Sequence, residues 1–257
     1  MTAPLLEARA LAVEIAAKTV CTDLALRVAR GERWAVLGVN GVGKTTLLRT
    51  LAGLRRAHAG EVVLEGDPLA ALTGRERARR RGMLLQSEHD EFEATVIEAV
   101  LAGRHPHVAP WAWESAADLA AARAALKRVA LPGFDERRLG SLSGGERRRV
   151  SIAALLAQDP ALMLLDEPTS HLDLHHQVAI LDVLAASATP HGKALVMSLH
   201  DVNLAARYCT HALLLFGGGQ TEQGPVPEVL APATLSRLYA HPVARIDGPL
   251  GPVFAPG

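Results

Sequence analysis

The run from Gly38 to Thr46 has the residue types and the spacing of a phosphate-binding loop. It reads Gly-Val-Asn-Gly-Val-Gly-Lys-Thr-Thr and fits the pattern G-x-x-x-x-G-K-T. Glycines let successive backbone N–H groups turn towards an anion, and a following helix adds the positive end of its dipole. In such loops the lysine reaches the β- and γ-phosphates, and the next hydroxyl is a Mg²⁺ ligand. We predict a nucleoside triphosphate site formed by Asn40, Gly41, Val42, Gly43, Lys44, Thr45 and Thr46, with Thr45 also on the metal.

The second group able to do chemistry is the carboxylate pair Asp166 and Glu167. The pair follows the apolar run Leu162–Leu165, which is typical of a buried strand. In an ATPase with a phosphate-binding loop, the first carboxylate orients the Mg²⁺ shell and the next accepts a proton from the attacking water. The pattern predicts Asp166 as a metal residue and Glu167 as the general base. A capped strand end is the alternative interpretation.

The elements that must position these groups alternate along the chain. Short strands are expected at Leu5–Leu11, Leu24–Val28, Trp34–Leu37, Glu61–Leu64 and Met83–Leu85. The pattern is helical from about residue 92, with helices over Ser115–Ala130 and from Gly144 onward. Strands at Ala194–Leu199 and Ala212–Phe216 and helices at His175–Ala186 and Leu204–Tyr208 complete the pattern.

Composition excludes several classes of protein. Apolar residues make up 49% and charged residues 21% of the 257, which argues against a disordered chain. The longest apolar runs have the length of strands, whereas a bilayer span needs about 20 residues. The 27 basic and 27 acidic residues cancel, so nucleic acid is not an expected partner. The N-terminus lacks a signal-peptide pattern, and Cys21 and Cys209 lack metal-ligand spacing, so reduced cytosolic thiols are expected.

The run Leu142-Ser143-Gly144-Gly145-Glu146 is more specific than the loop or the carboxylates alone. It resembles the signature sequence of the ATP-binding-cassette (ABC) ATPases. Other elements of that family occur in the same order: Gln86 after the strand Met83–Leu85, the run Pro168–Asp173, and His200 after the strand Ala194–Leu199. Together these motifs cover nearly the whole chain, which is similar to an ABC nucleotide-binding domain.

The resemblance implies an α/β fold. It consists of a P-loop NTPase (RecA-like) core with an N-terminal antiparallel β-subdomain and an inserted α-helical subdomain. The expected single domain has its core at residues 1–90 and 159–246, its helical subdomain at 91–158 and an irregular tail at 247–257.

The resemblance also implies roles for the remaining motif residues. Glu167, His200 and Gln86 would be catalytic, with His200 on the γ-phosphate and Gln86 beside the Mg²⁺. Ser143, Gly144, Gly145 and Asp173 would act across the interface of a head-to-tail dimer, on ATP held by a second copy of the chain. The expected cofactors are therefore ATP and Mg²⁺, with Thr45, Gln86 and Asp166 around the metal.

One position departs from the family pattern. The aromatic residue that usually stacks on adenine falls at Ile15 by alignment through Leu11–Asp23, and Trp34 is the first aromatic of the chain. Base–aromatic stacking contributes about 1–3 kcal/mol, so adenine contact is expected to be weaker here.

Three further segments resemble the subfamily that energises type II importers of metal chelates. They are Gly103–His107, the extension His200–Tyr208 and the segment from Glu228 to Tyr239. The resemblance implies a transmembrane permease dimer, a periplasmic binding protein as an indirect partner, and a place on the cytoplasmic face of the inner membrane. The stretch Gly103–Ser115 most resembles the ATPases of cobalamin importers. Cobalamin is therefore the first candidate cargo, with haem and iron-siderophore chelates next. Trp111 and Trp113 are candidate anchors for a partner or for packing in the helical lobe.

Other functions remain open on the sequence. An ABC exporter ATPase shares the same ATP motifs, and a non-transport P-loop ATPase shares the phosphate-binding loop. A two-cassette translation factor and a coiled-coil chromosome ATPase each need a feature that this sequence lacks. A metabolic P-loop kinase would lack the run Leu142–Glu146 that this sequence has.

Overall fold

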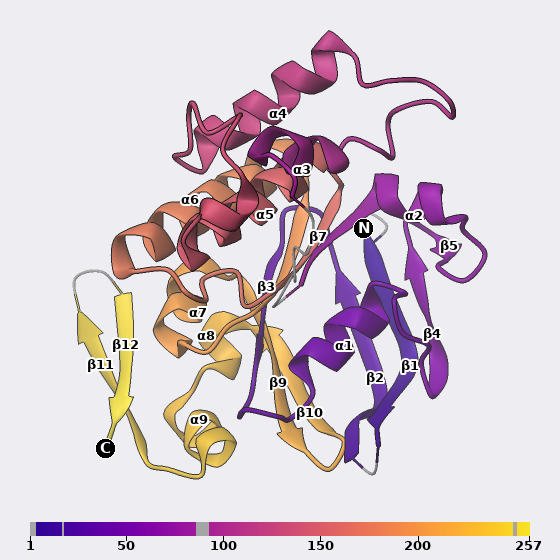
Figure 1. The fold of residues 1–257 in the computed structure, drawn as a ribbon. Coiled ribbons are helices and arrows are strands. Elements are labelled where there is room, and N and C mark those ends of the chain that lie inside the picture. Colours follow the sequence, from indigo (N-terminus) through magenta and orange to yellow (C-terminus); the bar gives the residue numbers. More distant parts are fainter. Residues whose placement is uncertain (1–3, 17, 86–92, 249–250) are drawn as a thin grey trace.

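The computed structural model describes residues 4–16, 18–85, 93–248 and 251–257. Within them a six-stranded sheet and a four-stranded sheet lie on either side of the helix α1, Lys44–Leu51. The remaining large helices cover the other face of the six-stranded sheet (Figure 1). The predicted α/β fold, with its antiparallel β-subdomain and helical part, is confirmed.

The six-stranded sheet carries the site at the carboxyl ends of its parallel strands. Its order is β10-β9-β3-β8-β7-β6, and all neighbours are parallel except β10 and β9. The strands are β3 Arg33–Leu37, β6 Arg81–Leu84, β7 Leu162–Asp166, β8 Ala194–Ser198, β9 His211–Gly217 and β10 Gln220–Pro225. Side chains alternate between its two faces, so Trp34 and Val36 join the core around α1, whereas Ala35 and Leu37 join the core under the helices.

The antiparallel sheet has the order β2-β1-β4-β5. Its strands are β1 Leu6–Ile15, β2 Lys18–Val28, β4 Ala59–Leu64 and β5 Asp67–Pro68. The strands β1 and β2 extend further than the apolar pattern predicted, because their solvent-facing halves carry polar side chains. The short helix α2, Gly74–Arg80, leads from this sheet to β6.

Helices fill the segment between β6 and β7. They are α3 Val96–Ala102, α4 Ala116–Arg128, the 3₁₀ turn η1 Leu139–Ser141 and α5 Gly144–Gln158. Each of α3, α4 and α5 contacts the other two, and their apolar side chains share one cluster with the sheet. The predicted boundary near residue 90 lies outside the described residues.

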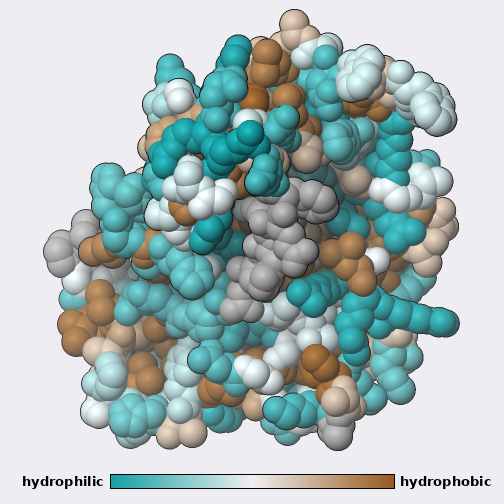
Figure 2. All heavy atoms as spheres, in the orientation of Figure 1, coloured by the Kyte–Doolittle hydropathy of each residue, from teal (hydrophilic) through white to brown (hydrophobic). Residues whose placement is uncertain are grey.

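The helices α6 Leu174–His191, α7 Val202–Tyr208, α8 Val226–Val229 and α9 Pro232–Tyr239 alternate with or follow the last strands of the sheet. Within the part of the chain that the structure describes, every helix is too short or too polar to span a bilayer. Figure 2 shows hydrophilic residues over most of one face, with hydrophobic residues in separate patches between them.

The prediction of an irregular tail over residues 247–257 is wrong. The strand β12, Gly251–Pro256, pairs with β11, Val243–Gly248, as an antiparallel hairpin. The prolines Pro252 and Pro256 suggested irregular structure because proline breaks a central strand, but they are tolerated in a two-stranded ribbon with free edges. The hairpin exchanges two hydrogen bonds with Asn203 of α7, a long-range contact that no local pattern reports.

Candidate nucleotide-binding and catalytic site

The phosphate-binding loop connects the end of β3 to the start of α1. Gly43 caps this helix with φ of 112°, in the region that favours glycine. A Cβ atom at Gly43 would lie 2.5 Å from a methyl group of Val20 on β2. The packing of the antiparallel sheet against the loop therefore requires glycine here, independently of any ligand.

Lys44 points back into the loop. Its Nζ donates hydrogen bonds to the carbonyl oxygens of Gly38 at 2.8 Å and Val39 at 3.3 Å. Burial lowers the pKa of Lys44, and the charges of Glu167 and Asp166 oppose that change. A buried ammonium held by neutral carbonyls gains from an anionic ligand, so the arrangement fits a bound phosphate.

Asp166 is fully buried at the end of β7. Its Oδ1 accepts a hydrogen bond from the Ser198 hydroxyl at 2.7 Å, and its Oδ2 has no hydrogen-bond partner among the described residues. A buried carboxylate oxygen without a donor suits a cation or the water shell of a cation. Asp166 therefore fits the Mg²⁺ role that the sequence predicts.

Glu167 is held in a strained conformation next to Asp166. Its φ is 50°, which is uncommon for a residue other than glycine. Its N–H donates to Ser198 Oγ at 2.8 Å, and its carbonyl oxygen accepts from Arg148 Nη2 at 2.8 Å and from Ser170 N–H at 3.1 Å. These bonds direct the Glu167 side chain towards His200, whose Nε2 lies 2.6 Å from its Oε1.

These residues surround a hollow of about 510 Å³. It is lined by Ile15, Asn40, Gly41, Gly43, Lys44, Thr45, Thr46, Glu167 and His200. The structure thus brings together the loop, the predicted base and the predicted histidine. Asp166 lies behind this lining, Val42 packs against the core around α1, and Gln86 lies outside the described residues. Ile15 lies at the hollow, as the alignment for the adenine position expects.

The signature residues form a second hollow of about 450 Å³. It is lined by Ser143, Gly144, Gly145, Glu146, Arg149, His171, Leu172, Asp173 and His176. Ser143 caps α5 in a reciprocal arrangement with Glu146, whose N–H donates to Ser143 Oγ at 3.2 Å. A Cβ atom at Gly145 would lie 3.1 Å from the carbonyl oxygen of His171, so glycine permits the close approach of the Asp173 loop.

Asp173 begins α6 at the edge of the second hollow. Its Oδ1 accepts a hydrogen bond from the N–H of His176 at 2.9 Å, and hydrogen bonds from His176 lower the pKa of Asp173. The two hollows share no lining residue. The signature residues therefore do not complete the phosphate-binding hollow of their own chain.

Two further residues support the site and were missed on the sequence. Ser198 bonds both Asp166 and Glu167; a hydroxyl at the end of an otherwise apolar strand was its signal. Arg148 on α5 donates to the carbonyl oxygens of Leu85, Asp166 and Glu167. Its position within the basic run Arg147–Arg149 gives it no distinct signal in the sequence.

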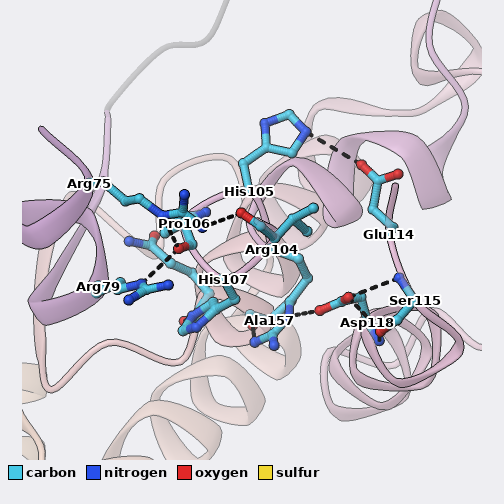
Figure 3. Close-up of polar contacts among 12 residues, drawn as sticks. Arg75, Arg79, Arg104, His105, Pro106, His107, Glu114, Ser115, Asp118 and Ala157 are labelled. Atoms are coloured by element: carbon cyan, nitrogen blue, oxygen red, sulfur yellow. Dashed lines mark hydrogen bonds and ion pairs between the residues drawn. The ribbon is translucent and has the colours of Figure 1, made fainter. Parts of the chain in front are cut away.

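The segment Gly103–Ser115 is fixed at its base and exposed at its tip. Arg75 and Arg79 of α2 both donate to the carbonyl oxygen of Pro106, at 3.0 and 2.8 Å (Figure 3). Beyond this base, Trp111 and Trp113 are 103% and 90% exposed. Packing inside the helical lobe, one of the two alternatives for these tryptophans, is therefore not observed.

Comparison with known proteins places these features in a family. The family model described as ABC transporter matches residues 21–170. The chain is 37% identical to a cobalamin import ATP-binding protein of Halobacterium salinarum over 93% of its own length, and it spans 60% of that relative. It is 42% identical to a hemin import ATP-binding protein of Nocardia farcinica, covering 95% of this chain and 86% of that one. It is 36% identical to a ferric enterobactin transport ATP-binding protein of Escherichia coli, covering 90% of this chain and 86% of that one.

A solved structure agrees with these relatives. An inward-facing putative metal-chelate type ABC transporter superposes with a TM-score of 0.85 at 28% identity, covering 99% of this chain and 98% of the matched one. The loop, the carboxylate pair and the signature run all lie within the matched segment 21–170. The chain belongs to the ABC transporter family.

Proposed function

We propose that this chain is the ATP-hydrolysing subunit of an ABC importer for a large metal chelate. The observation that carries the proposal is the convergence of Lys44, Glu167 and His200 on one hollow formed around the phosphate-binding loop. Phosphate binding, a base and a histidine beside it are the parts that hydrolysis of a γ-phosphate needs.

The loop, Lys44, Glu167 and His200 each have a defined task. The N–H groups of the loop and the ammonium of Lys44 bind the phosphates of ATP. The Glu167 carboxylate accepts a proton from the attacking water, and His200 holds that carboxylate and contacts the γ-phosphate. Thr45 and Asp166 would hold Mg²⁺ together with Gln86, which is not among the residues that the structure describes. When bound, this ion neutralises charge on the phosphate oxygens.

The second hollow requires a second copy of the chain. Ser143 and the N–H groups that open α5 form an anion site that the chain's own loop does not use. In a head-to-tail dimer with two-fold symmetry, each signature faces the ATP held by the other copy, and Asp173 lies at the interface. Two ATP molecules are then enclosed between two chains.

The transport role follows from the relatives. Their names specify import of cobalamin and of hemin and transport of ferric enterobactin, and these cargoes share the chemistry of a large metal chelate. A transmembrane permease dimer is the proposed direct partner and a periplasmic binding protein the indirect one. The chain would then be peripheral, on the cytoplasmic face of the inner membrane.

Different observations favour different cargoes, and cobalamin is the first choice. The segment Gly103–Ser115 favours cobalamin, whereas the relatives at 42% identity that import hemin favour haem. Iron-siderophore chelates follow. ATP-driven uptake into liposomes that contain this chain and its cognate permease separates the cargoes. Uptake of haem without cobalamin would reject the first choice alone, and outward movement would reject import in favour of export.

Hydrolysis itself needs a simpler experiment. Phosphate release from ATP by the purified chain, with and without Mg²⁺, is expected to depend on the ion and on Glu167. Absence of release in both the isolated chain and the permease complex would contradict the enzymatic proposal.

A further inference from the structure

The C-terminal hairpin contacts the helix that follows His200. β12 lies against α7 (Figure 1), and Phe254 is buried at this contact with 6% of its surface exposed. The opposite side of the hairpin faces away from the body, since the cross-strand pair Ile246 and Val253 is 57% and 46% exposed. The hairpin is thus attached to the rest of the chain along one side.

Asn203 provides the hydrogen bonds between α7 and the hairpin, whereas on the other strand the Val243 N–H donates to Ser236 Oγ of α9 at 2.9 Å. The Asn203 Oδ1 accepts a hydrogen bond from the N–H of Phe254 at 2.7 Å, and its Nδ2 donates to the carbonyl oxygen of Phe254 at 3.2 Å. A primary amide offers the same acceptor and donor as a peptide group, so Asn203 pairs with β12 as a neighbouring strand would. Because both bonds go to the main chain, they fix the position of α7 relative to the hairpin.

The same residue is tied to the turn that presents His200. Asp201 caps α7, and its Oδ1 accepts a hydrogen bond from the N–H of Asn203 at 2.7 Å. A hollow of about 260 Å³ separates the segment His200–Val202 from Tyr239 and the hairpin. Since the space beside this segment is not filled by packed side chains, hydrogen bonds have a larger part in holding it.

We propose that Asn203 is a positioning residue for ATP hydrolysis. Through its two bonds to Phe254 it anchors the start of α7 to the C-terminal hairpin, and through the Asp201 cap it holds His200 at Glu167. The hairpin is then a brace for the histidine rather than a passive tail. This inference rests on the proposed hydrolysis of ATP.

The test is the kinetics of ATP hydrolysis by the full chain carrying Asn203→Ala. We expect kcat to fall on the order of tenfold with KM within about twofold, because a small misplacement of a reacting group lowers the rate more than it lowers binding. Asn203→Asp keeps the acceptor for the Phe254 N–H but sets a second acceptor oxygen against the Phe254 carbonyl oxygen, so it is also expected to lower kcat. This variant serves if the alanine variant does not fold.

The matched control is Tyr208→Phe, which removes one hydrogen bond at the other end of the same helix. The Tyr208 hydroxyl donates a hydrogen bond to Asp182 at 3.0 Å, and Tyr208 does not line the hollow between His200–Val202 and the hairpin. This variant is expected to keep kcat. An equal loss in Tyr208→Phe and Asn203→Ala would indicate general loosening of α7 and would overturn the proposal.

A double-mutant cycle separates positioning from stability. If Asn203 acts through His200, then Asn203→Ala should leave kcat unchanged in a His200→Ala background. A further tenfold loss in that background would overturn the inference, as would an unchanged kcat in the single variant. Hydrolysis by the unaltered chain is the separate check on the proposed function, so the two failures are distinguishable.

Discussion

The Nε2 atom of His200 lies 2.6 Å from Oε1 of Glu167, although the two residues follow different strands of the six-stranded sheet. The strands β7 and β8 are neighbours, and Ser198 at the end of β8 bonds both Asp166 and Glu167 at the end of β7. The contact therefore results from strand pairing, which places these ends at one edge of the sheet.

Replacing the base should lower turnover strongly while ATP binding persists. Glu167→Gln is expected to lower kcat by about 10²–10⁴-fold, because an amide cannot accept the proton of the attacking water. ATP affinity should persist, since Lys44 and the loop are unaltered. Steady-state phosphate release and calorimetric titration measure the two quantities. Glu136→Gln, on the exposed surface, is the control, and an unchanged kcat in Glu167→Gln would remove Glu167 from this role.

Removing the buried ammonium should weaken nucleotide binding itself. Lys44→Ala deletes a charge that is buried beside the loop carbonyls and faces the hollow. Charge-assisted hydrogen bonds contribute about 1.5–3 kcal/mol each, so we expect an increase in Kd of at least about tenfold. Lys127→Ala on the exposed side of α4 should bind ATP normally. Equal affinities for both variants would show that Lys44 does not contact the phosphates.

Blocking the hollow at the signature residues should prevent dimer formation and leave ATP binding at the phosphate-binding hollow unchanged. Ser143→Arg places a long cation where the signature would face a partner's nucleotide, so single-chain ATP affinity should stay nearly unchanged. Size-exclusion chromatography of the Glu167→Gln chain with ATP should show a dimer that Ser143→Arg removes. Ser115→Arg is a matched control, because Ser115 caps α4 in the same reciprocal manner but does not line the hollow. A dimer that survives Ser143→Arg would reject the head-to-tail arrangement.

The aliphatic side chain at the adenine position should permit other bases. With Ile15 in place of an aromatic residue, GTP is expected to compete within about tenfold of ATP, since one stacking contact contributes about 1–3 kcal/mol. Ile15→Tyr should tighten ATP binding by a comparable factor. Competition titration measures both effects. A preference for ATP above a hundredfold in the unaltered chain would mean that another side chain reads the base.

The two thiols should be unreactive in the folded chain. Burial raises the pKa of Cys21 to about 11 and that of Cys209 to about 12, so both are protonated near neutral pH. Their contribution to stability is complete below the ordinary thiol pKa of about 8.5 and is lost as pH rises through these higher values. A chromogenic disulfide reagent at about pH 8 should react only after unfolding. Rapid labelling of the native chain would contradict the burial of both residues.

The sequence by itself determined the local chemistry of this protein. The phosphate-binding loop, the Asp166–Glu167 pair and the helix that Ser143 caps each depend on residues close together in the chain, so spacing and residue type were sufficient to predict them. The buried strand before the carboxylate pair followed for the same reason, because β7 is a continuous apolar run. The α/β core was expected from the resemblance to ABC nucleotide-binding domains.

Only the tertiary structure decided which of these groups meet. Strand order places His200 at Glu167, brings Ser198 under both carboxylates and leaves Ser143 in a hollow of its own. It also converts the proline-containing tail into a hairpin held by Asn203. These contacts join residues far apart in the chain, and their free energy comes from burial and hydrogen bonds that exist only after the sheet has formed, so no local pattern reports them.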